Sequence, residues 1–319
     1  MKISDMHCDM GTNLYERTLR GEKNIFKACH LDNLRKGDCK LVFMACFFSG
    51  EQDWKTMQDM ILNCNKEIND NLDCLRQVKC KEDLIEDEKI LGLISVEGMC
   101  GVKDDFGQRI EWMYEHGVRV ASLVWNESNA LADGWPNDPR RGLSEHGFEV
   151  IKKMNELKMI VDVSHINECG FWDIVNASTR PIIATHSNAR RLCGHDRNLT
   201  DQQIKAIAST GGIIGLNSCG DLINEVSSEQ TSLNLARHAK YMADLVGVEH
   251  IACGFDYMDF LDEYDGSDQG GNENAIDLVD AGDSQNLINS LYEVGFNDDE
   301  VSKIAYYNVH NFLKEQLWV

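Results

Sequence analysis

Lys2-Ile3-Ser4-Asp5-Met6-His7-Cys8-Asp9 is a short β-rich run near the start of the chain, and the rest of the sequence is organised around it. Residues i and i+2 of an extended strand point to the same face, so His7 and Asp9 project together while Cys8 points away. An imidazole beside a carboxylate suits an ion such as zinc. Taken alone, His7-Cys8-Asp9 is better explained by a strand-end histidine that only makes a hydrogen bond. The later strands decide between that structural histidine and a metal ligand.

Strand-like and helix-like segments alternate along the chain. We expect eight strands, at residues 3–9, 40–48, 90–98, 118–125, 159–165, 181–187, 211–218 and 250–256. We expect helices at residues 54–71, 147–157, 201–209, 233–245, 285–294 and 298–316. Thr200 is the expected N-cap of the third of these helices.

This alternation predicts parallel βαβ units, and eight such strands in one chain predict a TIM (β/α)8 barrel. We expect the barrel to occupy residues 1–319 as a single domain. A doubly wound open sheet is the alternative fold. It is disfavoured because no Gly-x-Gly-x-x-Gly opens a helix after a strand.

Residues able to bind a metal or a substrate follow most of the expected strands. In TIM barrels the chemistry lies at the C-terminal ends of the strands. The matched positions hold His7, Asp9, Glu97, Trp125, Asn126, His165, His186, Asn217, Ser218 and Asp256. Each has an ordinary structural alternative, such as a core histidine, a rim acid paired with an arginine, or a helix cap. Their convergence on one rim favours a metal site.

Charge balance favours two metal ions at this rim. Three carboxylates and a bound hydroxide carry four negative charges, which two divalent ions neutralise, whereas one ion would leave surplus anions buried. Two ions about 3.5–4 Å apart would activate a water molecule and polarise a carbonyl together. Mixed imidazole and carboxylate ligands suit Zn²⁺, with Mn, Co and Fe left open.

The net charge of −22 argues against nucleic acid and against an anionic membrane surface as partners, because both select basic patches. No apolar run is long enough to span a bilayer, and no basic segment followed by an apolar one marks a signal peptide. The twelve cysteines include no Cys-x-x-Cys pair, so we expect reduced thiols, mostly in the core, in a cytoplasmic protein.

The chain resembles the membrane (renal-type) dipeptidase family, peptidase family M19 of the amidohydrolase superfamily. The resemblance covers nearly the whole chain and rests on pieces in a specific order, namely His7-Cys-Asp9, Ser95-Val-Glu-Gly98, Asp162-Val-Ser-His165, Thr185-His-Ser-Asn-Ala189, Arg197-Asn198 and Gly254-Phe-Asp256. It implies a metal-dependent dipeptidase in which a hydroxide bridging two metal ions attacks the peptide bond. D-residues at the C-terminal position of the dipeptide are among the implied substrates.

The resemblance also implies the metal ligands. His7 and Asp9 would bind one ion, and His165 and His186 would bind the other. Glu97 would bridge the two ions. Six other histidines are interpreted as structural or solvated, namely His30, His116, His146, His238, His250 and His310. His195 is an intermediate case, because it lies close in sequence to a candidate substrate arginine.

The substrate-binding residues follow from the same resemblance. Asp256 would hold the bridging water, take its proton and later protonate the leaving amine. Arg197 would bind the C-terminal carboxylate of the dipeptide through its planar guanidinium, although without the resemblance a surface arginine is the simpler interpretation. Trp125 stands where the human-type enzymes have a histidine that contacts the scissile carbonyl. Either Asn126 donates a hydrogen bond in its place or the metal alone polarises the carbonyl. Trp125 itself is expected to wall the pocket, the commoner role for an aromatic side chain.

Two other functions stay open at this point. One is an amidohydrolase that acts on a non-peptide amide, a lactone or a deaminase substrate. The other is a metal-binding scaffold without catalysis, which the retention of Asp256 disfavours. A homodimer is also left open, and residues 257–283 are expected to form a solvated loop.

Overall fold

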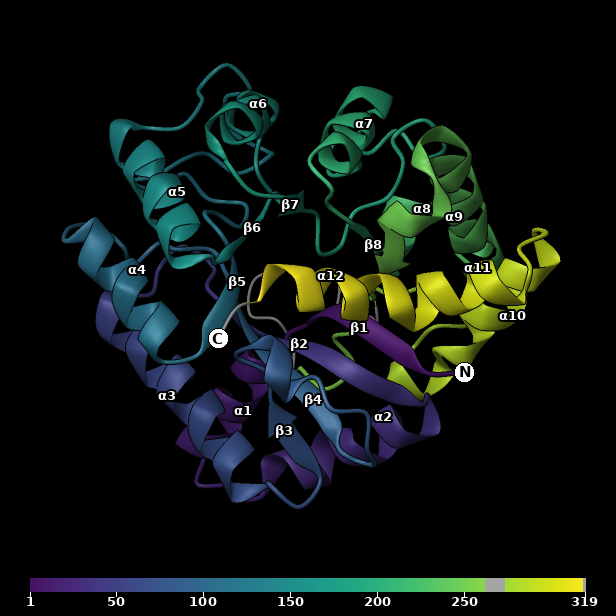
Figure 1. Cartoon of the computed structure of the whole chain (residues 1–319), viewed down its shortest axis with the longest axis horizontal. Helices are drawn as coiled ribbons and strands as arrows, with labels where there is room; N and C mark the ends of the chain where they lie inside the picture. The colour runs from purple at the N-terminus through teal and green to yellow at the C-terminus, as the bar shows by residue number, and fades with distance from the viewer. Residues whose placement is uncertain (262–272, 318–319) are drawn as a thin grey trace.

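A closed parallel β-barrel forms the centre of the protein (Figure 1). The computed structural model describes residues 1–261 and 273–317. The barrel strands lie in the order β7-β6-β5-β4-β2-β1-β9-β8, and a parallel bridge between Ala184 and Ile214 joins the chain after β7 to β8 and closes the ring. These strands are β1 (Ile3–Cys8), β2 (Cys39–Phe47), β4 (Ile90–Glu97), β5 (Val118–Ser122), β6 (Ile160–Asp162), β7 (Ile182–Ile183), β8 (Ile214–Leu216) and β9 (Ile251–Cys253). The predicted TIM barrel is confirmed.

Each of the eight predicted strands overlaps one barrel strand. Most of the observed strands are shorter than predicted because the polar residues at their C-terminal ends leave the hydrogen-bonded ladder and turn over the barrel mouth. One short strand, β3 (Leu75–Gln77), was not predicted; it lies outside the ring and pairs in parallel with the first residues of β4.

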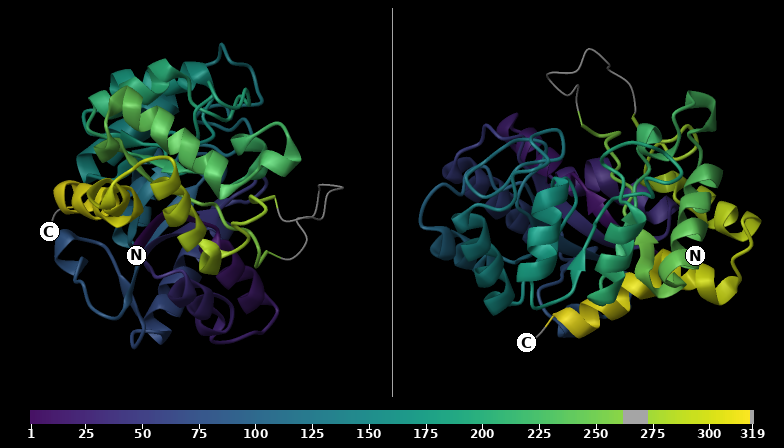
Figure 2. Two further views of the ribbon diagram at one scale, coloured as in Figure 1. Left: turned by 90° about the vertical axis from the view of Figure 1, so that its right-hand side faces the viewer. Right: turned by 90° about the horizontal axis from the view of Figure 1, so that it is seen from above.

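Helices surround the barrel on all sides (Figure 2). They are α1 (Met10–Leu19), α2 (Leu31–Lys36), α3 (Trp54–Asp70), α4 (Phe106–Glu115), α5 (Glu145–Leu157), α6 (Glu168–Ala177), α7 (Asp201–Ser209), α8 (Gly220–Ile223), α9 (Ser232–Val246), α10 (Gln285–Glu293), α11 (Asp298–Ser302) and α12 (Asn308–Gln316). The predicted helices correspond to α3, α5, α7, α9, α10 and the pair α11–α12, which a π-helical turn at Lys303–Tyr307 joins. Thr200 caps α7 as predicted, since its hydroxyl accepts from the backbone N–H of Gln203.

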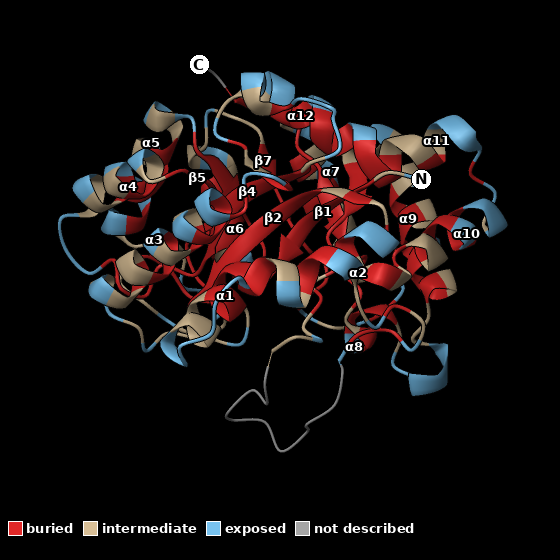
Figure 3. Cartoon of the chain, turned by 90° about the horizontal axis from the view of Figure 1, so that it is seen from below, coloured by how far each residue is buried: buried red, intermediate tan, exposed pale blue. Residues whose placement is uncertain are grey.

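The apolar core has two parts. One lies between the barrel and the surrounding helices, where the helices turn buried faces inward and exposed faces outward (Figure 3). The other fills the barrel interior and includes Met6, Phe43 and Leu93, which pack with Val309 and Phe312 from the C-terminal helix α12. Helix α12 therefore closes one end of the barrel, and the opposite end, where the strands terminate, is left for polar side chains (Figure 1).

Several smaller expectations can be compared with the structure. Eight of the twelve cysteines are buried, as expected. Among the described residues, no helix combines the length and the apolar character that a membrane crossing requires. The expectation of a solvated loop at residues 257–283 falls partly outside the described residues, and in its described part it is wrong for Ala275 and Leu278, which are fully buried.

Candidate metal centre and active site

The first predicted group of ligands converges on His7, at the end of β1. Its Nε2 lies 3.2 Å from Glu97 Oε2, 3.6 Å from Asp9 Oδ1 and 3.7 Å from Asp256 Oδ1. Although these four residues come from three strand ends, their side chains share one small volume. His7 Nε2 and Asp9 Oδ1 are buried and have no hydrogen-bond partner.

The second group surrounds the other carboxylate oxygen of Glu97. Oε1 lies 2.8 Å from His165 Nε2 and 3.5 Å from His186 Nε2. The two Nε2 atoms are themselves 2.9 Å apart. The carboxylate of Glu97 thus faces His7 with one oxygen and the histidine pair with the other. The structure brings all six residues together as the sequence predicted.

The hydrogen bonds on the far side of each ring decide which ring nitrogen carries a proton. His165 Nδ1 lies 2.9 Å from the amide oxygen of Asn126, which can only accept, so Nδ1 carries the hydrogen. His186 Nδ1 lies 2.8 Å from Thr185 Oγ1, a hydroxyl that already donates its hydrogen to Asp162. Both Nε2 atoms therefore present lone pairs to each other.

Two nitrogen lone pairs 2.9 Å apart, beside a carboxylate oxygen, repel one another unless a cation lies among them. Imidazole nitrogens and carboxylate oxygens are the ligand set that Zn²⁺ and related ions accept. The donor atoms of the two groups therefore fit divalent metal ions.

Burial sets the protonation of these groups in the absence of a metal ion. It raises the pKa of Glu97 to about 7 and raises the pKa of Asp256. Burial and the charge of Arg197 hold the pKa values of His165 and His186 well below the ordinary value, so both imidazoles stay neutral, which is the metal-binding form. Burial also lowers the pKa of His7, but Glu97 and the other nearby carboxylates outweigh it and raise that pKa overall.

Two of the site residues have an unusual backbone. His165 has φ 66° and Asp256 has φ 62°, values that residues other than glycine rarely adopt. Each such conformation costs about 1–3 kcal/mol, which the surrounding structure must offset. Each lies three residues beyond the end of its strand, β6 for His165 and β9 for Asp256, and its side chain faces the cluster of histidines and carboxylates.

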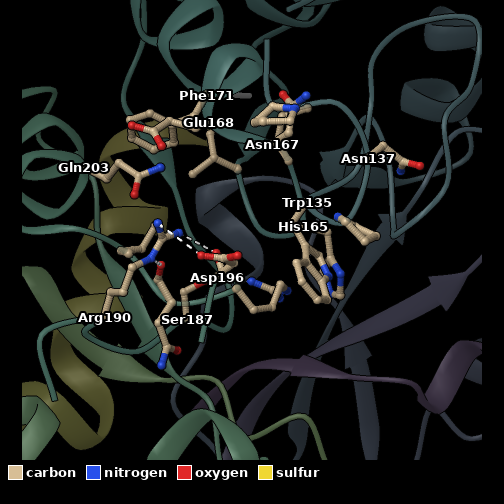
Figure 4. Close-up of a pocket in the computed structure, with 17 residues that line it drawn as sticks. Trp135, Asn137, His165, Asn167, Glu168, Phe171, Ser187, Arg190, Asp196 and Gln203 are labelled. Carbon is tan, nitrogen blue, oxygen red and sulfur yellow. Dashed lines mark hydrogen bonds and ion pairs between the residues drawn. The ribbon is translucent and has the colours of Figure 1, made fainter. Parts of the chain in front are cut away.

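A cavity of about 470 Å³ opens beside the cluster of histidines and carboxylates (Figure 4). His165 and Arg197 both line it. Arg197 is buried, and its two terminal nitrogens donate to Ser187 Oγ and to the carbonyl of His186. Its Nε is buried and has no hydrogen-bond partner.

Two predicted substrate residues, Trp125 and Asn126, lie next to His165 and are not among the residues that line this cavity. The ring of Trp125 packs edge-on against Phe47 and lies 6.1 Å from the ring of His165, so its role as a pocket wall stays a prediction. The side-chain oxygen of Asn126 is engaged with His165 Nδ1, so a contact between Asn126 and substrate stays a prediction.

Sequence reasoning missed Trp135. It lies in the long connection between β5 and α5, where Gly134 pairs with Ile166 in the segment that follows β6. The backbone N–H of Trp135 donates to the carbonyl of His165. Its ring lines the cavity 5.0 Å from the ring of His195 (Figure 4). No local pattern marks it, because its position depends on pairing between distant segments.

Most of the remaining histidines make hydrogen bonds with backbone or amide groups away from the cluster, as interpreted from the sequence. These include His30, His116, His238 and His250. His195 accepts from the N–H of Arg197 and lies beside the cavity.

A parallel barrel whose strand ends gather histidines and carboxylates defines a metal-dependent hydrolase. The model of one family, Membrane dipeptidase (Peptidase family M19), matches residues 1–317. The chain therefore belongs to the M19 membrane dipeptidases and is a metal-dependent dipeptidase.

The chain is also similar to individual proteins. An uncharacterised protein of Klebsiella pneumoniae is 34% identical over 74% of this chain and 84% of its own length. An uncharacterised dipeptidase of Schizosaccharomyces pombe is 28% identical over 74% of this chain, and the match spans 62% of that longer protein. Among solved structures, a metallopeptidase from Rhodobacter sphaeroides, bound to a phosphinate mimic of L-Ala-D-Ala, shares the fold with a TM-score of 0.85 at 20% identity, over 100% of this chain and 99% of its own.

Proposed function

We propose that this dipeptidase uses two divalent metal ions, with Zn²⁺ the best match to the ligands. His7 and Asp9 would hold one ion, His165 and His186 the other, and Glu97 would bridge them. The observation that carries this proposal is the pair of facing Nε2 lone pairs beside a carboxylate that reaches both groups. When bound, two such ions supply an activated water and polarise the scissile carbonyl.

In this proposal Asp256 carries the proton. One of its oxygens accepts from Asn217 Nδ2 at 3.2 Å, and the other faces the cluster 3.7 Å from His7 Nε2. The Asn217 contact fixes the rotation of the carboxylate. The oxygen facing the cluster can then accept the proton of the attacking water and return it to the leaving nitrogen, which is too basic to depart as an anion.

Arg197 would hold the C-terminal carboxylate of the dipeptide. A buried guanidinium with an unpartnered Nε fits a planar anion. Acceptance of a D-residue at the C-terminal position is part of the proposal, and the L-Ala-D-Ala mimic bound by the Rhodobacter protein supports it. The cytoplasmic location and the homodimer stay predictions.

The test is Asp256→Asn, assayed against dipeptides with added Zn²⁺ or Mn²⁺. Asparagine keeps the size and one acceptor oxygen but cannot carry the proton, so kcat should fall by roughly 10²–10⁴-fold. Metal content should stay at two ions per chain, because the five proposed ligands are unchanged. Asp259→Asn, three residues further along the chain, is the matched control and should keep normal turnover. Near-normal turnover of Asp256→Asn would require another base, and loss of an ion would make Asp256 a ligand.

A further inference from the structure

A single buried hydroxyl lies behind the histidines of the cluster. Thr185 Oγ1 donates to Asp162 Oδ2 at 2.6 Å. The other oxygen of Asp162 accepts from the backbone N–H groups of Ser164 and Thr185, both at 2.9 Å. Because Asp162 acts only as an acceptor, the hydrogen of the Thr185 hydroxyl points toward it and cannot point toward a histidine.

The lone pairs of the same hydroxyl face the imidazoles. His186 Nδ1 lies 2.8 Å from Oγ1 and must donate to it. The second lone pair is shared between the Ser164 hydroxyl at 3.3 Å and His7 Nδ1 at 3.5 Å, so the contact with His7 is weaker. The direction of one hydrogen, set by Asp162, thus determines which nitrogen of His186 is free to bind a metal.

The backbone holds this hydroxyl in place. The carbonyl of Thr185 lies against Gly215 and Gly254, where an added Cβ would meet the carbonyl oxygen at 1.9 Å and 1.8 Å. This close approach belongs to the closure of the barrel between β7 and β8. Thr185 and Asp162 are 1% and 4% exposed, so water does not compete for their hydrogen bonds.

We propose that Asp162 and Thr185 are positioning residues that fix His186 with its hydrogen on Nδ1 and its lone pair on Nε2. The proposal rests on the ligand role of His186 given above. Hydrogen-bond partners behind a ligating histidine typically contribute about 10–100-fold to metal affinity. A purely structural role, in which these bonds only seal the junction of β6 and β7, would instead change stability and leave affinity and tautomer alone.

The first experiment measures Zn²⁺ affinity by competition with a chelator. Thr185→Val removes the hydroxyl but keeps the branched shape, and it should weaken one ion-binding step by about 10–100-fold, the step that uses His186. Thr185→Ser keeps the hydroxyl and should stay within a few-fold of the wild type. Thr12→Val is the matched control, because Thr12 is also a buried threonine. Its hydroxyl accepts from the backbone N–H of Phe47 and contacts Met60 Sδ instead of a histidine of the cluster, so its loss should leave affinity unchanged.

The second experiment reads the histidine tautomers in the metal-free protein by long-range ¹H–¹⁵N NMR with labelled histidine. Asp162→Asn reverses the chain of hydrogen bonds, since the new amide donates to Thr185, whose hydrogen then turns toward His186. We expect His186 to move its hydrogen from Nδ1 to Nε2, which removes the metal-binding lone pair. His165, whose Nδ1 faces Asn126, should keep its tautomer in the same spectra.

The outcomes separate the two proposals. Wild-type affinity and an unchanged His186 tautomer in Thr185→Val would overturn the positioning role, as would an unchanged tautomer in folded Asp162→Asn. If Asp162→Asn does not fold, the contrast between Thr185→Val and Thr185→Ser decides. A wild-type chain that binds no Zn²⁺ would overturn the metal ligands and so the proposed function, while the NMR result would still decide whether the hydroxyl sets the tautomer.

Discussion

Arg197→Met removes the guanidinium that we propose binds the C-terminal carboxylate of a dipeptide. Arg197 is 7% exposed, so its pair with a carboxylate would form away from water. Truncating one partner of such a pair costs about 2–5 kcal/mol. That cost corresponds to roughly 30- to 5,000-fold in kcat/KM, since each 1.36 kcal/mol is tenfold. Methionine keeps much of the length and the apolar stem, which limits the loss of packing.

The assay compares kcat/KM for a dipeptide and for its C-terminal amide, in the wild type and in the variant. The amide carries no carboxylate, so Arg197→Met should leave its hydrolysis little changed while the dipeptide loses most of its rate. Arg190→Met is the matched control, because Arg190 lines the same cavity but is tied to Asp196 and to the carbonyl of Asn198. Equal losses for dipeptide and amide would refute the carboxylate role and leave Arg197 as a structural residue.

Three further predictions concern the metal, the pH dependence and the cavity. His165→Ala or His186→Ala should lower the metal content from two ions toward one and abolish activity, and two ions in both variants would contradict the ligand assignment. Burial, with a smaller effect of the Arg17 charge, lowers the pKa of His30 to about 3, so the unfolded chain protonates this histidine first as the pH falls. The contribution of His30 to the free energy of unfolding should therefore decrease by ~2 kcal/mol from pH 7.5 to pH 5. Urea titrations of His30→Gln should lack that decrease. An equal decrease in the wild type and in the variant would refute this role of His30. Trp135→Ala should raise KM more for dipeptides with a large C-terminal side chain than for those ending in alanine, and an equal change for both would contradict a role of this wall in specificity.

The sequence predicted the barrel and the gathering of histidines and carboxylates at its rim because both follow from short-range periodicity. Alternation within β1 places His7 and Asp9 on one side, and the parallel topology brings every strand end to the same rim. Given that topology, Glu97, His165 and His186 had to lie near them. The structure adds which atoms face one another, for example that the two oxygens of Glu97 face different histidine groups.

The partners behind the histidines illustrate what the sequence does not encode locally. Asp162 and Thr185 stood in segments that matched the family, yet no role could be given to them, because their hydrogen bond joins two strands. The oxygen of Asn126 faces His165, a contact that the spacing did not indicate, and the predicted contact of Asn126 with a substrate stays a prediction. In each case spacing predicts where a side chain lies, but the direction of a hydrogen bond depends on what the partner already donates or accepts. In our proposal, the metal affinity of the site depends on buried donors and acceptors whose roles become evident only when the barrel is closed.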